Sequence, residues 1–240
     1  MANGIYIAVS GAQAEMRHLD VIANNLANAN TPGFKADRIN FREVLAKSSV
    51  PDEQQDRRFV EVSGTHTDLN SGTLRLTGNP LDLAVLGDGF FKVGTPRGER
   101  ITRGGSFIQA ADGTVMTSSG NPLLGRDGQP VKIAPNGGPP VIDANGSVAQ
   151  GSRIVAQLDF VEINDPTALR KEEMGLFATD PGNLKRAELS QIQQGSIEES
   201  NGNPIRSMIS LVETQRHFDT LHRAIETYKE LDSKVTRIVS

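Results

Sequence analysis

The strongest constraint on the fold is a change in the spacing of apolar residues along the chain. Near both ends apolar side chains recur at gaps of three and four residues, whereas between them the period is two. Gaps of three and four place side chains on one face of an α-helix, and a period of two places them on one face of a strand. The sequence therefore predicts an α+β protein in which an all-β central domain is flanked by two long helices.

The first helix is expected within residues 1–31. Its stripe has the heptad spacing of a helix that packs against other helices, and it consists of Ile5, Val9, Ala12, Met16, Leu19, Ala23 and Leu26. Pro32 and Gly33 follow this segment. Proline lacks a backbone donor and disfavours helix in the preceding residue, so the helix should end before it.

The second helix is expected over residues 204–240. Asn203 is a preferred N-cap residue, and Pro204 suits the first helical position. The stripe of this helix lies in its second half and consists of Phe218, Leu221, Ile225, Tyr228, Leu231, Val235 and Ile238. A helix of this length would reach about 50 Å, which is more than a small domain needs.

The central domain is expected over residues 73–203. Short alternating runs such as Leu81–Leu86 are separated by turn signals such as Gly120–Pro122 and Asn145–Gly146, a pattern typical of hairpins in a sandwich or barrel-like unit. The longest run, Ile154–Ile163, is predicted to form one central strand. Residues 32–72 are predicted to be a linker or extended segment, with a solvated loop at Pro51–Arg58.

Charge and composition exclude several partners. The formal net charge of −4 lacks the basic excess of a nucleic-acid-binding surface. Without cysteine the chain can form no disulfide and no thiolate metal site. No charged and apolar leader is found at the start and no run of 18 apolar residues occurs, so neither a secretory signal peptide nor a membrane-spanning helix is expected.

The sequence also offers no centre for catalysis. His217 and His222 are five residues apart, a spacing that does not direct two imidazoles to one metal on a helix. Gly87 and Gly89 begin like a dinucleotide-binding loop, but Lys92 occupies the position of the third glycine. We therefore expect a non-enzymatic protein without catalytic residues, cofactor, metal or small-molecule substrate.

The two apolar stripes are the candidate assembly interface. One neighbouring helix buries too little surface to offset the conformational entropy that is lost when such a helix is ordered, which favours several neighbours in a polymer. The alternative is a monomer in which the two terminal helices form a hairpin. The apolar pattern leaves both alternatives open.

Four segments, in order along the chain, resemble a known family. They are NNLANANTPGFK from Asn24, GNPLDLAVLGDGFFKV from Gly78, ITRGGSF from Ile101, and GSIEESNGNP from Gly195 followed by LVETQRHF. They resemble the axial proteins of the bacterial flagellum and, among these, the basal-body rod proteins. The segment Val155–Phe177 resembles proximal-rod members most, with distal-rod members next.

The resemblance implies a structural subunit of the periplasm-spanning rod, exported unfolded through the flagellar type III channel without a cleaved signal. Its terminal helices would pack as a coiled coil in the wall of a tube that transmits motor torque. The implied partners are copies of itself and other rod subunits, with the surrounding ring proteins as further candidates. The alternatives are a distal-rod or hook-type axial protein, and a rod-associated cell-wall hydrolase.

Overall fold

The computed structural model describes residues 2–46, 57–187 and 189–239. The chain divides into two compact units, which are treated separately. The helical unit contains residues 1–27, 37–68 and 203–240, and the β unit contains residues 28–36 and 69–202. The prediction of a mostly-β central region with a long helix at each end is confirmed.

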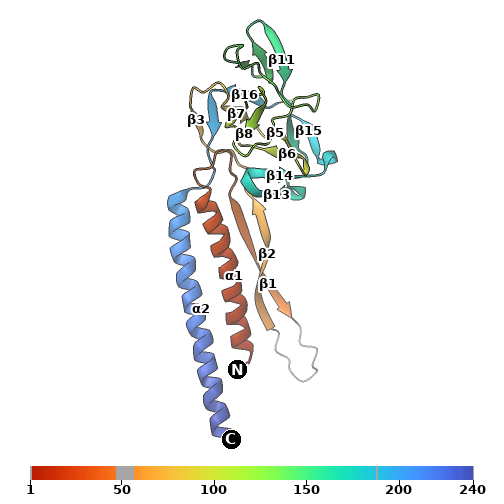
Figure 1. The fold of residues 1–240 in the computed structure, drawn as a ribbon. Helices are drawn as coiled ribbons and strands as arrows, with labels where there is room; N and C mark the ends of the chain where they lie inside the picture. The colour runs from red at the N-terminus through yellow and green to blue at the C-terminus, as the bar shows by residue number, and fades with distance from the viewer. Residues whose placement is uncertain (1, 47–56, 188, 240) are drawn as a thin grey trace. The chain divides into compact units, whose positions relative to one another are not determined.

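In the helical unit, α1 (Ala2–Ala27) packs along α2 (Pro204–Val239), as Figure 1 shows. The N-cap predicted for α2 is present, since the Arg206 backbone N–H donates to Asn203 Oδ1 at 3.0 Å. The first helix ends at Ala27, before the turn in which the Thr31 backbone N–H donates to the Asn28 carbonyl at 3.0 Å.

The segment expected to be a linker or extended chain contains an ordered hairpin. Strands β1 (Asp37–Ala46) and β2 (Arg57–Thr67) pair antiparallel, with Asp37 opposite Thr67 and a register shift after Asn40. The hairpin packs beside α1. Charged residues interrupt its apolar alternation, which is why the period-two signal was weak. Of the predicted solvated loop, residues 51–56 lie outside the described residues, while Arg57 and Arg58 begin β2.

The β unit is built from short antiparallel strands. In chain order these are β3 (Leu74–Leu76), β4 (Leu83–Leu86), β5 (Phe90–Thr95), β6 (Gly98–Thr102), β7 (Phe107–Gln109), β8 (Val115–Thr117), β9 (Val141–Ile142), β10 (Ser147–Gln150), β11 (Arg153–Gln157), β12 (Phe160–Ile163), β13 (Arg170–Lys171), β14 (Leu176–Ala178), β15 (Leu184–Arg186), β16 (Gln191–Gln194) and β17 (Ser196–Glu198). Six of them form one sheet in the order β13-β14-β6-β5-β12-β15. The others form smaller sheets, β11-β10-β9, β16-β4, β17-β3 and β7-β8.

Strand β5 places its side chains on both faces of the large sheet, because successive residues of a strand point to opposite sides. Phe91 lies in the larger apolar cluster, where its ring meets Phe107 edge to face at 5.4 Å. Phe90 lies in a second cluster and meets Phe177 in the same manner at 5.9 Å. Both faces of the sheet are therefore covered by apolar side chains.

The run Ile154–Ile163 is two strands rather than one. Strand β11 pairs with β10, whereas β12 pairs with β5 and β15 in the large sheet. The break falls at Leu158 and Asp159, whose backbone N–H groups donate to Gly146 and Leu124 instead. Uniform hydrophobicity concealed this change of sheet, since Ile154 is exposed and Val161 is buried.

Candidate functional site

Close contacts define the register between α1 and α2. A Cβ added at Gly4 would meet the Tyr228 ring at 2.7 Å, and one at Gly11 would meet Leu221 Cδ1 at 3.3 Å. One heptad further on, His18 Nδ1 lies 3.4 Å from Thr214 Oγ1. Each step of seven residues along α1 is thus matched by a step of seven backwards along α2. The helices are antiparallel, and small residues on α1 admit α2 closely.

The stripe predicted on α1 is divided between two environments. Ala12 is buried, and Ile5, Leu19 and Leu26 are partly buried. Val9, Met16 and Ala23 are exposed. The side that meets α2 runs through Gly4, Gly11 and His18, one residue before Ile5, Ala12 and Leu19. Part of the stripe is therefore buried or partly buried within the helical unit, and the rest is exposed.

The stripe predicted on α2 has a similar division. Phe218, Leu221, Ile225 and Tyr228 are partly buried, while Leu231 is exposed. Val235 and Ile238 belong to the helix, but their side chains lie outside the described set. Leu221 and Tyr228 are the residues that face glycines of α1.

A second apolar stripe on α2 was missed by the sequence analysis. It follows the N-cap directly and consists of Ile205, Met208, Ile209 and Val212, all of them exposed. The spacing i, i+3, i+4, i+7 was the available signal. The stripe that was predicted lies only in the second half of this helix. This surface adds to the candidate assembly interface.

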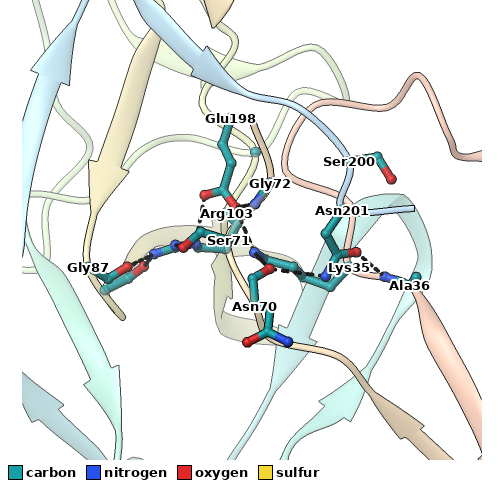
Figure 2. A network of polar contacts seen from close by, with 12 residues as sticks. Lys35, Ala36, Asn70, Ser71, Gly72, Gly87, Arg103, Glu198, Ser200 and Asn201 are labelled. Carbon is teal, nitrogen blue, oxygen red and sulfur yellow. Dashed lines mark hydrogen bonds and ion pairs between the residues drawn. The ribbon is translucent and has the colours of Figure 1, made fainter. Parts of the chain in front are cut away.

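A buried ionic cluster joins three distant segments of the β unit, and Figure 2 shows its residues. Lys35 Nζ lies 2.6 Å from Glu198 Oε1, and Arg103 Nε lies 3.0 Å from Glu198 Oε2. The Arg103 contact is an ion pair without the angle of a hydrogen bond. All three side chains are at most 2% exposed. We refer to Lys35, Arg103 and Glu198 as the ionic joint.

Backbone groups complete the joint. Lys35 Nζ donates to the Asn70 carbonyl at 2.7 Å, and Glu198 Oε1 accepts from the Gly72 backbone N–H at 2.8 Å. Arg103 Nη1 donates to the carbonyls of Gly87 and Gly89. Burial lowers the pKa of Arg103 from its ordinary value, and the Glu198 and Asp88 carboxylates oppose that shift. Arginine stays protonated in proteins even so, because its ordinary pKa is far above the physiological range.

The joint lies where the chain passes between its units. These passages follow residues 27, 36, 68 and 202. Asn201 Oδ1 accepts from the Ala36 backbone N–H at 2.8 Å, and Asn201 Nδ2 donates to the Asn70 carbonyl at 3.0 Å. One amide side chain therefore holds three of the four passing segments together, and Lys35 attaches to two of the same segments.

The joint was not predicted from the sequence, although each of its three residues lies in a segment that resembles the rod proteins. Lys35 ends NNLANANTPGFK, Arg103 is the third residue of ITRGGSF, and Glu198 lies in GSIEESNGNP. Neighbouring residues gave no signal that these three charges are buried. The two glycines that resembled a dinucleotide loop lie between strands β4 and β5, and their carbonyls receive the Arg103 guanidinium.

Within residues 2–46, 57–187 and 189–239, no three His, Asp or Glu side chains are arranged to hold a metal ion. Two of the histidines lie near the same carboxylate, with Glu15 lying 3.6 Å from His18 Nδ1 and 3.7 Å from His217 Nδ1. Neither α1 nor α2, over its described length, has a stretch apolar enough to cross a membrane.

Comparison with known proteins places these features in a family. Residues 5–35 match the model "Flagella basal body rod protein", residues 84–150 match "Flagellar hook protein FlgE/F/G D1 domain", and residues 193–238 match "Flagellar basal body rod FlgEFG protein C-terminal". The matched ranges contain most of α1, the centre of the β unit and most of α2.

Similar proteins align over nearly the whole chain. The flagellar basal-body rod protein FlgF of Caulobacter vibrioides is 34% identical, over 99% of this chain and 98% of its own length. FlgF of Mesorhizobium japonicum is also 34% identical, over 98% of this chain and 100% of its own. FlgG of Bacillus subtilis is 27% identical, over 96% of this chain and 97% of its own length. The chain therefore belongs to the family of flagellar basal-body rod proteins.

Proposed function

We propose that this chain is a structural subunit of the flagellar basal-body rod and polymerises through its terminal helices. The observation that carries this proposal is full-length similarity to rod proteins, with most of α1 and most of α2 inside the matched family models. The proposed assembly interface consists of the two predicted stripes, Ile5 to Leu26 and Phe218 to Ile238, together with Ile205, Met208, Ile209 and Val212.

The exposed apolar side chains support this interface. Val9 and Met16 on α1, like Met208 and Ile209 on α2, remain exposed after the helices have packed together. Full burial of such a side chain contributes about 1.5–3 kcal/mol, and roughly half of that remains to be gained here. Association itself costs about 4–15 kcal/mol. The net free energy of one contact between subunits is therefore near zero, whereas a polymer in which each subunit makes several contacts is stable.

The finer parts of the proposal rest on the family resemblance. We place the subunit in the proximal rod, which is supported by the segment Val155–Phe177 and by higher identity to the two FlgF proteins than to FlgG of Bacillus subtilis. In this proposal the subunit is exported without a cleaved signal. It folds at the growing tip and forms part of a periplasmic tube that transmits torque. No contact among the described residues favours the hydrolase alternative.

The test is to place a carboxylate on the exposed apolar surface. Met208→Asp should leave the subunit folded, because Met208 is exposed, yet abolish its incorporation into rods and motility. An unpaired charge is too unfavourable to bury in every copy of a polymer. Thr220→Asp adds the same charge to an exposed polar position of α2 and should spare motility. Normal swimming of cells carrying Met208→Asp would refute the interface.

A matched change inside the helix pair separates folding from assembly. Leu221→Asp should disrupt the α1–α2 contact at Gly11 as well as assembly, and should reduce helical circular dichroism in the purified subunit. Asp219→Ala, on an exposed position, should have little effect on either. If Leu221→Asp assembles normally, the contact between the helices is not required for rod formation.

A further inference from the structure

Two exposed apolar stripes run along the helix pair. The outer α1 stripe consists of Tyr6, Val9 and Met16, which are 54%, 37% and 52% exposed. The outer α2 stripe consists of Ile205, Met208, Ile209 and Val212, which are 69%, 54%, 56% and 49% exposed. Apolar surface of this extent on two neighbouring helices indicates that each stripe is covered in an assembly.

The stripes lie on opposite outer faces of the pair. Val9 and Met16 each precede by two residues a position that contacts α2, namely Gly11 and His18. Two residues along an α-helix correspond to a rotation of about 200°. On α2, Val212 has the same offset from Thr214, which contacts α1. Each stripe therefore points away from the partner helix of its own chain.

The stripes also lie at different levels along the pair. The contacts Glu15–His217 and His18–Thr214 place Met16 level with Arg216 of its own chain. The first residue of the outer α2 stripe, Ile205, lies about three helical turns from Arg216, which is roughly 16 Å. One subunit therefore cannot cover its own stripes. A second copy at the same level along the helices would not bring its α2 stripe opposite the α1 stripe of the first copy.

We propose that the outer α1 stripe of one copy packs against the outer α2 stripe of a second copy displaced by about three helical turns, roughly 16 Å, along the helices. This inference rests on the proposed polymer. At this displacement Met16 meets Ile205 and Val9 meets Val212. Both contacts form together because Val9 and Met16 are one heptad apart on α1, as are Ile205 and Val212 on α2. Met208 and Ile209 then lie between the two contacts.

A second copy fits this surface better than an unrelated occupant. The two stripes have the same chemistry, the same heptad spacing and similar lengths. Because they face opposite ways and differ in level, the contact uses two different patches and leaves a free stripe at each end. Such a heterologous contact does not close on two subunits but repeats as a ring or helix.

The absence of cysteine permits a direct test of the register. Two differently tagged single-cysteine variants are co-expressed in flagellated cells that lack the unmodified chain, and assembled rods are isolated and oxidised. A disulfide requires Cα atoms about 4.4–6.8 Å apart. We expect heterodimers for Met16→Cys with Ile205→Cys, and for Val9→Cys with Val212→Cys.

Exchanging the partners provides a matched control. The control pairs are Met16→Cys with Val212→Cys, and Val9→Cys with Ile205→Cys. In each control pair the two cysteines are about 10 Å out of register, so they should yield at least about tenfold less disulfide. Rods in which the exchanged pairs form disulfides as well, or in which no pair does, would overturn the stagger while leaving the polymer function standing. Absence of the tagged chains from isolated rods would instead refute the proposed function.

Discussion

Lys35 Nζ lies 2.6 Å from Glu198 Oε1, and this contact joins residues 163 positions apart in the sequence. It attaches residues 28–36, which we term the strap, to the last strand of the β unit. Lys171 reinforces the attachment by donating to the Lys35 carbonyl at 2.6 Å, with its ammonium 3.8 Å from the centre of the Phe34 ring. The strap is thus part of the β unit although it directly follows α1.

Removing the carboxylate of the joint should be strongly destabilising. Glu198→Gln removes the carboxylate that pairs with Lys35 and Arg103 in the buried joint, which we expect to lower the free energy of unfolding by about 3–5 kcal/mol. Denaturant unfolding of the purified subunit measures this loss in the free energy of unfolding. The neighbouring Glu199→Gln breaks an exposed pair with Arg75 and should cost at most about 1 kcal/mol. Equal losses for the two variants would contradict a special role for the joint.

Gly33 provides a test of the close packing of the strap. Its φ is +70°, and an added Cβ would lie 2.3 Å from the Arg103 carbonyl carbon. Gly78 has a φ of +75° with nothing within 4 Å of that position. Gly78→Ala should therefore cost about 1–2 kcal/mol of backbone strain, and Gly33→Ala about 1–3 kcal/mol more. Thermal unfolding of the two variants compares them, and similar melting temperatures would mean that the strap can shift freely.

The strap should also stabilise the β unit when supplied separately. A fragment of residues 69–202 lacks Lys35, and adding a peptide of residues 28–36 should raise its melting temperature as the peptide concentration increases. A peptide with Lys35→Met should have a much smaller effect, because it cannot pair with Glu198. Calorimetry with both peptides distinguishes the ionic contribution from contacts of the strap backbone. Equal shifts would show that the backbone contacts suffice.

Acid stability should depend on Glu172. The Arg100 guanidinium, whose Nε lies 3.1 Å from Glu172 Oε1, lowers the pKa of this carboxyl against the opposing effect of burial, and the charge of Arg97 assists. A folded-state pKa below the unfolded value contributes stability above about pH 4.5, and this contribution is lost as the pH falls through the folded-state pKa. Glu172→Gln should unfold more readily than the parent at pH 7 and equally readily at pH 2. Parallel stability curves would contradict this coupling.

The helices could be predicted from local signals. The pair Asn203–Pro204 marks the start of α2, and apolar heptads mark both helix interiors. The side of contact was harder to predict because Gly4 and Gly11, which face Tyr228 and Leu221, have no apolar side chain to count. Heptad spacing identifies an apolar face but does not tell which neighbour covers each part of it.

The hairpin and the ionic joint could not be read from periodicity. In β1, Ile39 and Phe41 alternate with polar residues, but Glu43 breaks the alternation where a third apolar residue would continue it. Lys35, Arg103 and Glu198 meet only after three segments have been brought together by the fold. A charged side chain is usually solvated, and nothing local distinguishes these three from exposed ones.

Backbone hydrogen bonds connect the strap to the end of the β unit. Gly33 donates to the Glu198 carbonyl at 2.7 Å, and Asn201 donates to the Phe34 carbonyl at 3.3 Å. The polypeptide therefore comes into the unit and departs from it along adjacent segments, the arrangement in which inserted domains are best tolerated. Strands β4 to β16 lie between the paired strands β3 and β17, so we expect insertions among them to leave the helical unit unchanged.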